Sequence, residues 1–170
     1  TSLSVASLIK IFKQNKISFD DRAVRYNCLI VSTQKRSLQI TSFRKDTRTF
    51  GRSADVESVQ NIEEDAKRRD FTINAFYCSF NGEIIDPLGN LEDLSNKRLK
   101  FIGDPESRIT EDYLRILRFF RFVAVLDLRY KDIDSKYLPI IKKHINRISE
   151  LSYERVAIEI RKIFLATSPS

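Results

Sequence analysis

Three arginines recur along one apolar stretch of this sequence. Arg115, Arg118 and Arg121 stand at every third position, and the positions between and after them are apolar up to Leu126. An apolar surface this continuous leaves a helix little solvent-facing side, so we expect a helix buried among others. Because arginine is almost never fully buried unless it is paired, these side chains need anions. The anions can be carboxylates of an internal salt-bridge network or the phosphates of a ligand, and the helix alone leaves both open.

Two carboxylates precede these arginines. Glu111 lies four residues before Arg115, the orientation that favours an ion pair on a helix, and Asp112 lies three residues before it. A carboxylate acceptor beside a rigid fork of donors can hydrogen-bond the edge of a nucleobase. We therefore predict that Asp112 and Arg115 contact a base. Arg118 and Arg121 would be left to face phosphates.

A second basic cluster lies at residues 67–75, with the sequence KRRDFTINA. Guanidinium groups pair with phosphate through parallel hydrogen bonds, so Arg68 and Arg69 are candidates to hold a triphosphate. Asp70 can accept from a sugar hydroxyl, and Asn74 falls on the same face as Asp70 if the segment is helical. A basic helix end followed by a cap is the alternative, and it is the better interpretation of this string taken alone.

Composition is typical of a globular protein that favours polyanionic partners. The chain has 170 residues, of which 42% are hydrophobic and 31% charged, and a net charge of +7. It has no run approaching the roughly 18 apolar residues of a membrane span, so we predict no membrane segment. Cys28 and Cys78 lie far apart, as in a protein of the reducing cytoplasm, which is the predicted location. We expect His144, which follows two lysines, to be solvated, and a zinc site or a hydrolytic triad is disfavoured.

The elements that must position these residues fall into two parts. Before residue 103 the patterns predict a helix over 4–14, strands over 23–32 and 37–43, a polar surface loop over 46–60, a helix starting at 61, and a hairpin at Asn81 and Gly82. After residue 103 they predict only helices, over 111–128, 135–147 and 152–166. We therefore expect a mixed α/β part at 1–103, followed by an all-helical part at 104–170.

Three motifs follow one another in the chain: EEDAKRRDFTINAF at 63–76, GEIIDPLGNLEDL at 82–94, and IGDPESRITEDYLRILRFFRFVA at 102–124. In this combination they resemble the class II tRNA nucleotidyltransferases (CCA-adding enzymes) and their bacterial poly(A) polymerase relatives. The resemblance implies an α+β fold. Residues 1–103 would form a partial, polymerase-β-like nucleotidyltransferase head with a small sheet, and residues 104–170 a helical neck that recognises the nucleotide.

The resemblance also implies what each motif contacts. Arg69, Asp70 and Asn74 would bind the ribose and phosphates of the incoming nucleotide. Asp112 and Arg115 would act as a protein template that reads the Watson–Crick edges of C and A.

Neighbouring residues would support this template. In the family pattern, Glu111 would hold the templating arginine, while Arg118 and Arg121 would face the nucleotide and its triphosphate. Glu154 and Arg155 match the helix that supports the templating helix in the family.

The implied reaction is attack by the 3′-hydroxyl of a tRNA on the α-phosphate of CTP or ATP. Pyrophosphate leaves, and two Mg²⁺ ions stabilise the attacking and leaving oxygens. A poly(A) polymerase of the same family is the first alternative. A degenerate, non-catalytic module that binds RNA or nucleotides is the second.

Several positions depart from the family pattern. The sequence begins at Thr1 and contains no Met, and the Gly-Gly phosphate loop and the DxD metal ligands of the family do not precede its first strands. We expect both to lie upstream, so that Mg²⁺ is bound outside this chain and the chain alone is inactive. Gln39 stands where the family usually has Glu, and Tyr113 where it typically has Pro, which leaves the start of the templating helix less rigidly set. The DID string at 132–134 falls between helices, where we expect it to be solvated.

Overall fold

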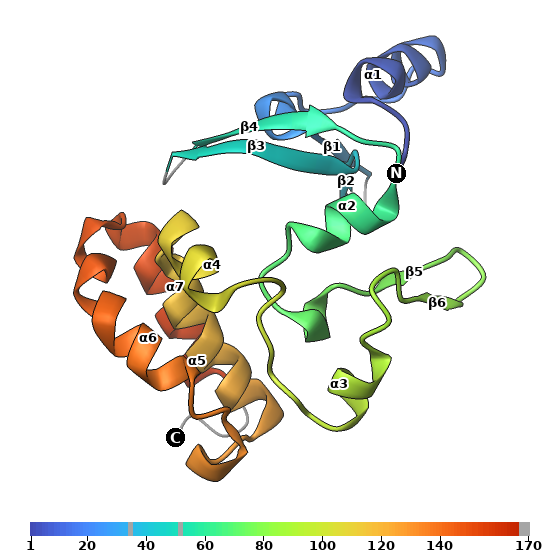
Figure 1. Ribbon diagram of the computed structural model, residues 1–170. Coiled ribbons are helices and arrows are strands. Elements are labelled where there is room, and N and C mark those ends of the chain that lie inside the picture. The colour runs from blue at the N-terminus through green and yellow to red at the C-terminus, as the bar shows by residue number, and fades with distance from the viewer. Residues whose placement is uncertain (34–35, 51–52, 167–170) are drawn as a thin grey trace. The chain divides into compact units, whose positions relative to one another are not determined.

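The computed structural model describes residues 1–33, 36–50 and 53–166. They form two compact units that divide between Arg68 and Arg69, and each unit is described separately (Figure 1). The fold is α+β, with small antiparallel sheets and many helices, as predicted. None of the helices in the described ranges is long and apolar enough to cross a membrane.

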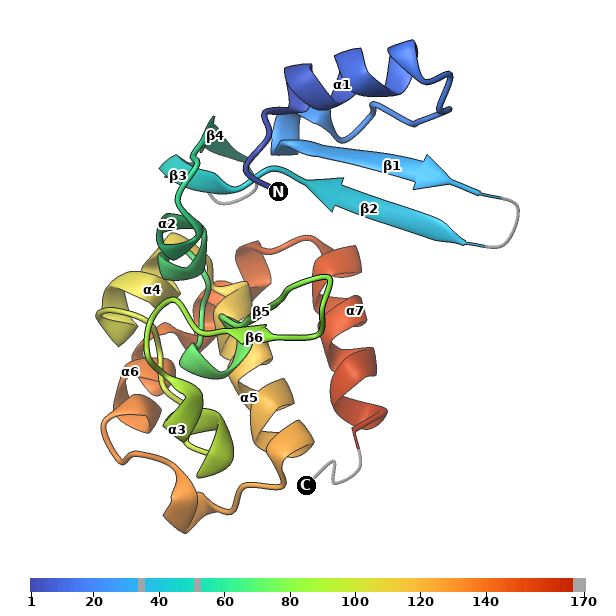
Figure 2. The same cartoon turned by 90° about the vertical axis from the view of Figure 1, so that its right-hand side faces the viewer.

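The first unit packs a helix against a two-stranded sheet (Figure 2). Helix α1 (Val5–Gln14) begins after Ser4, whose hydroxyl accepts a hydrogen bond from the Ser7 backbone N–H at 3.2 Å, as the predicted cap requires. The strands β1 (Cys28–Ser32) and β2 (Ser37–Thr41) pair antiparallel, with Leu29 opposite Ile40. The buried core of this unit consists of Val5, Leu8, Phe12 and Leu29.

Two of the predictions for this unit are wrong. The segment predicted as a strand over 23–32 starts with a 3₁₀ turn, η1 (Val24–Tyr26), and only its second half is a strand. The segment predicted as a surface loop over 46–60 contains most of β3 (Arg44–Phe50) and β4 (Ser53–Ser58), which pair antiparallel. A polar segment carries no alternating apolar signal, so a hairpin held by its backbone ladder escapes pattern-based prediction. Helix α2 (Ile62–Lys67), capped by Asn61, then closes the unit as expected.

The second unit begins with short elements and ends in helices. Its first part comprises the 3₁₀ turn η2 (Thr72–Asn74), the strands β5 (Tyr77–Cys78) and β6 (Ile84–Ile85), and helix α3 (Leu91–Ser95). The predicted hairpin is confirmed, because β5 and β6 pair antiparallel around a turn in which Gly82 adopts a φ of 85°. The remaining elements are helical: α4 (Pro105–Glu111), α5 (Leu114–Leu126), η3 (Tyr130–Asp132), α6 (Tyr137–His144), η4 (Ile145–Glu150) and α7 (Tyr153–Phe164).

The helix predicted over 111–128 starts only at Leu114, as α5, and a separate helix that was not predicted, α4, precedes it. Helix α4 ends at Glu111, and Asp112 takes an extended conformation with φ −156° and ψ 106° before α5 starts at Leu114. The pattern contained a signal for α4 that the prediction left unused. Asp104 caps its first turn by accepting from the Ser107 backbone N–H at 2.8 Å, and Pro105 occupies the first helical position.

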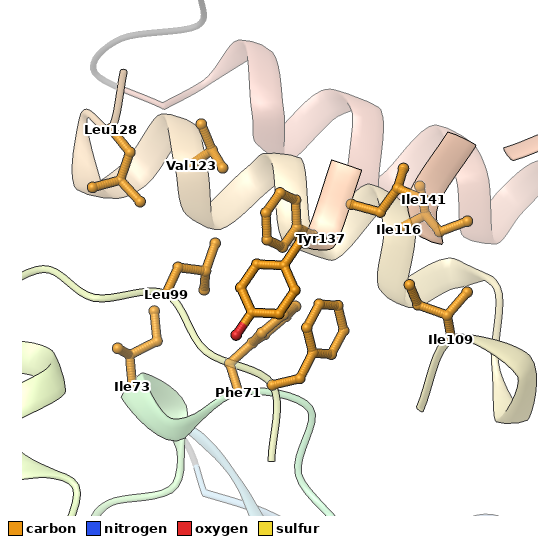
Figure 3. Close-up of a cluster of buried hydrophobic side chains, with 11 residues drawn as sticks. Phe71, Ile73, Leu99, Ile109, Ile116, Val123, Leu128, Tyr137 and Ile141 are labelled. Carbon is orange, nitrogen blue, oxygen red and sulfur yellow. The ribbon is translucent and has the colours of Figure 1, made fainter. Parts of the chain in front are cut away.

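An aromatic core joins the short elements to the helices (Figure 3). Phe71 contacts Phe101 with a ring-centroid separation of 4.8 Å, and Phe101 stacks on Phe119 of α5 at 5.9 Å with an interplanar angle of 5°. Tyr137 of α6 meets the Phe119 ring edge-on at 5.8 Å. Because residues 71 and 101 share this core with α5 and α6, the boundary predicted at 103 falls inside the second compact unit. The division into head and neck at 103 stays a prediction.

Candidate nucleotide-binding site

Asp70, the last residue of the RRD segment at 68–70, connects that segment to helix α5. The residue is only 4% exposed, and its Oδ1 accepts hydrogen bonds from Asn74 Nδ2 and Arg118 Nη2, both at 3.2 Å. Arg118 Nε lies 2.7 Å from the other carboxylate oxygen. Asn74 thus faces Asp70, as predicted, although a 3₁₀ turn rather than an α-helix brings the two together. Removing the cation that pairs with a buried carboxylate costs much more free energy than removing the partner of an exposed one, because an unpaired charge is left buried.

Glu111 holds two arginines at the end of α4. Its Oε2 accepts from Arg115 Nη1 at 2.5 Å and also from Arg108 Nη1. Arg115, which is buried, donates in addition to the backbone carbonyl of Arg108 at 2.6 Å. The ion pair between Glu111 and Arg115 that the spacing predicts is therefore present, across the junction of two helices.

Asp112 is an extended residue between α4 and α5, and two hydrogen-bond donors hold its carboxylate. Its Oδ1 accepts from the Leu114 backbone N–H at 3.2 Å, and its Oδ2 accepts from Arg155 Nη2 of α7 at 2.7 Å. About a quarter of the side chain, 24%, stays exposed. The two members of the predicted base-reading pair are thus each held by a separate partner, Asp112 by Arg155 and Arg115 by Glu111.

Two other predicted phosphate ligands, Arg121 and Arg68, also have carboxylate partners. Arg121 Nε donates to Glu159 Oε2 of α7 at 2.8 Å, where α5 and α7 pack together (Figure 1). In the first unit, Arg68 Nε donates to Asp65 Oδ1 at 2.9 Å. The internal salt-bridge network that the sequence left open therefore exists. It does not by itself decide whether phosphates bind the same arginines.

Arg108 is a site residue that the sequence prediction did not include. Besides binding Glu111, it donates from Nη2 to the backbone carbonyl of Arg69 at 2.6 Å, which ties α4 to the RRD segment. Its side chain is 12% exposed. The Asp104 and Pro105 signal for α4 was sufficient to place Arg108 three residues before Glu111 on one helix face.

The prediction of a solvated His144 is wrong. Its side chain is only 14% exposed, and its Nε2 lies 2.9 Å from Glu106 Oε1. The sequence prediction failed because α6 packs against α4, a helix that was not predicted.

The described residues bring together no ligand set for magnesium. Within 1–33, 36–50 and 53–166, no three His, Cys, Asp or Glu side chains lie close enough to hold a metal ion, and Gln39 is an exposed residue of β2. The DID string does line a hollow of about 270 Å³, but basic residues such as Arg98 and Lys131 share that lining. Asp134, as expected, is exposed, and it pairs with Lys136 at 2.9 Å. We therefore assign no Mg²⁺ ligand among these described residues and derive no step through the metal.

Glu159 makes the link between α5 and α7 sensitive to pH. Burial by itself raises the pKa of its carboxyl, but the hydrogen bonds and charges of Lys162 and Arg121 outweigh burial and hold the pKa below its ordinary value of 4.5. A carboxyl whose pKa is depressed in the folded state stabilises the fold above its unfolded pKa, and this contribution disappears as the pH falls through the folded pKa.

We therefore expect Glu159→Gln to lower the free energy of unfolding at neutral pH. The difference from the parent protein should shrink once the pH falls below 4.5. Urea titrations at a series of pH values measure this difference, and Glu154→Gln, which changes an exposed carboxylate on the same helix, is the matched control. A difference that stays constant down to acid pH would contradict the ion-pair assignment.

Comparisons with known proteins give the family of this chain. Residues 1–100 match the poly A polymerase head domain family. The chain is 36% identical over 146 residues to human mitochondrial CCA tRNA nucleotidyltransferase 1, covering 86% of this chain and 34% of the human protein. It is 36% identical over 148 residues to the CCA-adding enzyme of Streptococcus uberis, covering 86% of this chain and 36% of that enzyme.

A solved structure is similar to this chain as well. The CCA-adding enzyme of Bacillus stearothermophilus, crystallised in complex with CTP, matches 98% of this chain and 38% of its own, with a TM-score of 0.80 and 28% identity. The chain thus spans about a third of the length of the relatives it matches. On the match over residues 1–100, the chain belongs to the poly A polymerase head domain family.

Proposed function

We propose that this chain selects the nucleotide in an RNA 3′-end nucleotidyltransferase that adds C and A, from CTP and ATP, to tRNA. The observation that carries the proposal is the buried Asp70, which accepts from both Asn74 and Arg118. This contact joins the segment expected to bind ribose and phosphates to the arginine-bearing helix. The names of the relatives, which are CCA-adding enzymes, support the choice of C and A as the nucleotides added.

In this proposal the internal ion pairs hold the two base-reading side chains, Asp112 and Arg115, in place before the nucleotide binds. Arg155 restrains the Asp112 carboxylate, and Glu111 restrains the Arg115 guanidinium. A donor and an acceptor held in fixed positions lose little conformational freedom when a base binds, and they discriminate by geometry. Asp112 would accept from the exocyclic amino group, which A carries farther from the ribose than C does, and Arg115 would donate to the ring nitrogen beside that amino group.

The phosphate-binding part of the proposal rests on Arg69, Arg118 and Arg121. Arg118 has 34% of its side chain exposed, which leaves donors available beyond those that contact Asp70. Asp70 orients this guanidinium and can accept from a ribose hydroxyl in addition. The expectation that the 170-residue chain binds nucleotides weakly and adds none by itself stays a prediction.

Arg118→Ala in the intact protein should raise the KM for CTP and for ATP alike. A hydrogen bond to a charged group contributes about 1.5–3 kcal/mol, so we expect roughly a 10- to 150-fold increase. Arg98→Ala is the control, because Arg98 is an exposed arginine of the same unit that lies along the hollow and not among the predicted nucleotide ligands. Steady-state incorporation of labelled nucleotide into tRNA measures both variants. Equal KM values for Arg118→Ala and the parent protein would remove this arginine from the site.

The alternatives are separated by the products. A protein that adds C and then A to a tRNA lacking its 3′ CCA is a CCA-adding enzyme, and one that extends RNA with A alone is a poly(A) polymerase. The exposed, neutral Gln39 favours the third possibility, a module that binds nucleotides without catalysis. A folded, intact protein that binds CTP but incorporates neither nucleotide in the presence of Mg²⁺ would establish that third function and contradict our proposal.

A further inference from the structure

The first backbone N–H of α5 is capped by Asp112, whose Oδ1 accepts from Leu114 at 3.2 Å, and not by Tyr113, the residue directly before the helix. Tyr113 occupies the position before the first residue of α5, with φ −62° and ψ −16°, and its side chain forms no capping hydrogen bond. Only a ring-closed residue such as proline fixes φ by covalent geometry, so the conformation of Tyr113 depends on packing as well as on the hydrogen bonds of its neighbour Asp112. This junction also includes Asp112, so whatever holds Tyr113 also orients the adjacent carboxylate.

The Tyr113 ring packs against the end of α6 and the start of η4. It stacks on the His144 ring with a centroid separation of 6.2 Å and an interplanar angle of 30°, and the Arg147 guanidinium lies 5.0 Å from its centroid. Tyr113 also packs against the aromatic core of the unit. Contacts of aromatic rings with one another and with a guanidinium are attractive, and they prefer particular geometries.

His144 connects this packing to the other end of α4. Its Nε2 lies 2.9 Å from Glu106 Oε1, and Lys143 Nζ donates to the same oxygen at 2.5 Å. These two hydrogen bonds lower the pKa of Glu106, so the carboxylate stays ionised at neutral pH and keeps both partners. Glu106 lies in the first turn of α4, whereas Tyr113 lies just beyond its last residue. One imidazole therefore contacts the first turn of α4 and the residue that follows its C-cap.

We propose that Tyr113 and His144 are positioning residues that fix the α4–α5 junction and thereby set the selectivity between CTP and ATP. The two residues act through Asp112 and Glu111, which lie immediately before Tyr113. Loss of the ring contact would leave the junction held only by the hydrogen bonds of Asp112, so the junction could shift. A displacement of Asp112 changes its reach to C and to A by different amounts. This inference rests on the proposed function.

The test compares Tyr113→Ala with Tyr113→Phe in the intact protein, using a tRNA primer that requires C. We expect Tyr113→Ala to lower the ratio of kcat/KM for CTP to kcat/KM for ATP by about 3- to 10-fold, the scale typical of couplings through a packed network. Tyr113→Phe keeps the ring, so its ratio should stay within about twofold of the parent value. The ratio does not depend on how much of a preparation is folded, so a purely structural defect would not change it.

His144→Ala is a second variant for the same assay, and it takes the place of Tyr113→Ala if that variant does not fold. It should shift the ratio in the same direction, and the shifts of His144→Ala and Tyr113→Ala should not add in the double variant, because both remove one contact. Asp112→Ala in the same assay distinguishes a failure of the positioning role from a failure of the proposed function. An altered ratio for Asp112→Ala with unaltered ratios for Tyr113→Ala and His144→Ala overturns the positioning role. Unaltered ratios for all of them overturn the proposed function itself.

Discussion

Asp112→Ala is expected to abolish the discrimination between C and A while nucleotide binding stays measurable. The substitution removes the acceptor that Arg155 holds at 2.7 Å, but it leaves the Glu111 and Arg115 pair intact. A well-placed pair of hydrogen bonds to a base edge contributes about 1–3 kcal/mol of discrimination, or roughly 5- to 150-fold in the ratio of kcat/KM values. Incorporation of CMP and AMP into defined tRNA primers measures this ratio, and sequencing of the products detects misincorporation.

Asp134→Ala is the matched control for this experiment. Asp134 is an exposed carboxylate of the same unit whose partner is Lys136, so its removal should change neither the ratio nor the products. The templating role would be contradicted if Asp112→Ala lowered the kcat/KM values for CTP and ATP equally and caused no misincorporation. That outcome would assign Asp112 a role in holding α7 rather than in reading a base.

Phe119→Ala is expected to reduce the stability of the second unit more than any other change discussed above. The side chain is fully buried and contacts Phe71, Phe101 and Tyr137 at centroid separations of 6.2, 5.9 and 5.8 Å. Truncating a buried phenylalanine costs about 3–5 kcal/mol, because both transfer free energy and packing contacts are lost. Urea denaturation, followed by far-UV circular dichroism, measures the free energy of unfolding.

Phe80→Ala supplies the contrast. Phe80 is fully exposed at the turn of the β5–β6 hairpin, so its loss should change the free energy of unfolding by less than about 0.5 kcal/mol. A loss below about 1 kcal/mol for Phe119→Ala would show that the aromatic core is not the structure that joins residues 71–101 to the helices. In that case the boundary predicted at 103 would describe the folding units better than the division after Arg68 does.

Local signals in the sequence were enough to predict several elements correctly. Ser4 predicted the start of α1, Asn81 and Gly82 predicted the hairpin, and the periodic arginines predicted the buried helix α5. Each of these depends on residues within about one turn of each other, because caps, tight turns and helix periodicity are short-range effects. The pairing of Glu111 with Arg115 belongs to the same class, since its spacing of four residues is local.

The errors have the opposite character. The β3–β4 pairing joins polar segments without an apolar alternation, and the break at Asp112 interrupts a continuous helical pattern. Arg155 was linked to the site only through the family resemblance, and Arg108 was not predicted at all. For Asp112 and Arg108 the deciding contacts, with Arg155 and with the Arg69 carbonyl, lie outside the window that a pattern covers. For β3 and β4 the deciding interaction is a backbone ladder, which leaves no mark in the side-chain pattern.

The sequence by itself therefore determined which residue types are available for nucleotide chemistry and which of them lie on one helix. Only the tertiary structure decided which anion each arginine meets. Arg118 finds Asp70, and Arg121 finds Glu159, across separations of 48 and 38 residues. The physical reason is that a buried guanidinium must be neutralised within about 3 Å, and which carboxylate comes that close depends on how the helices pack.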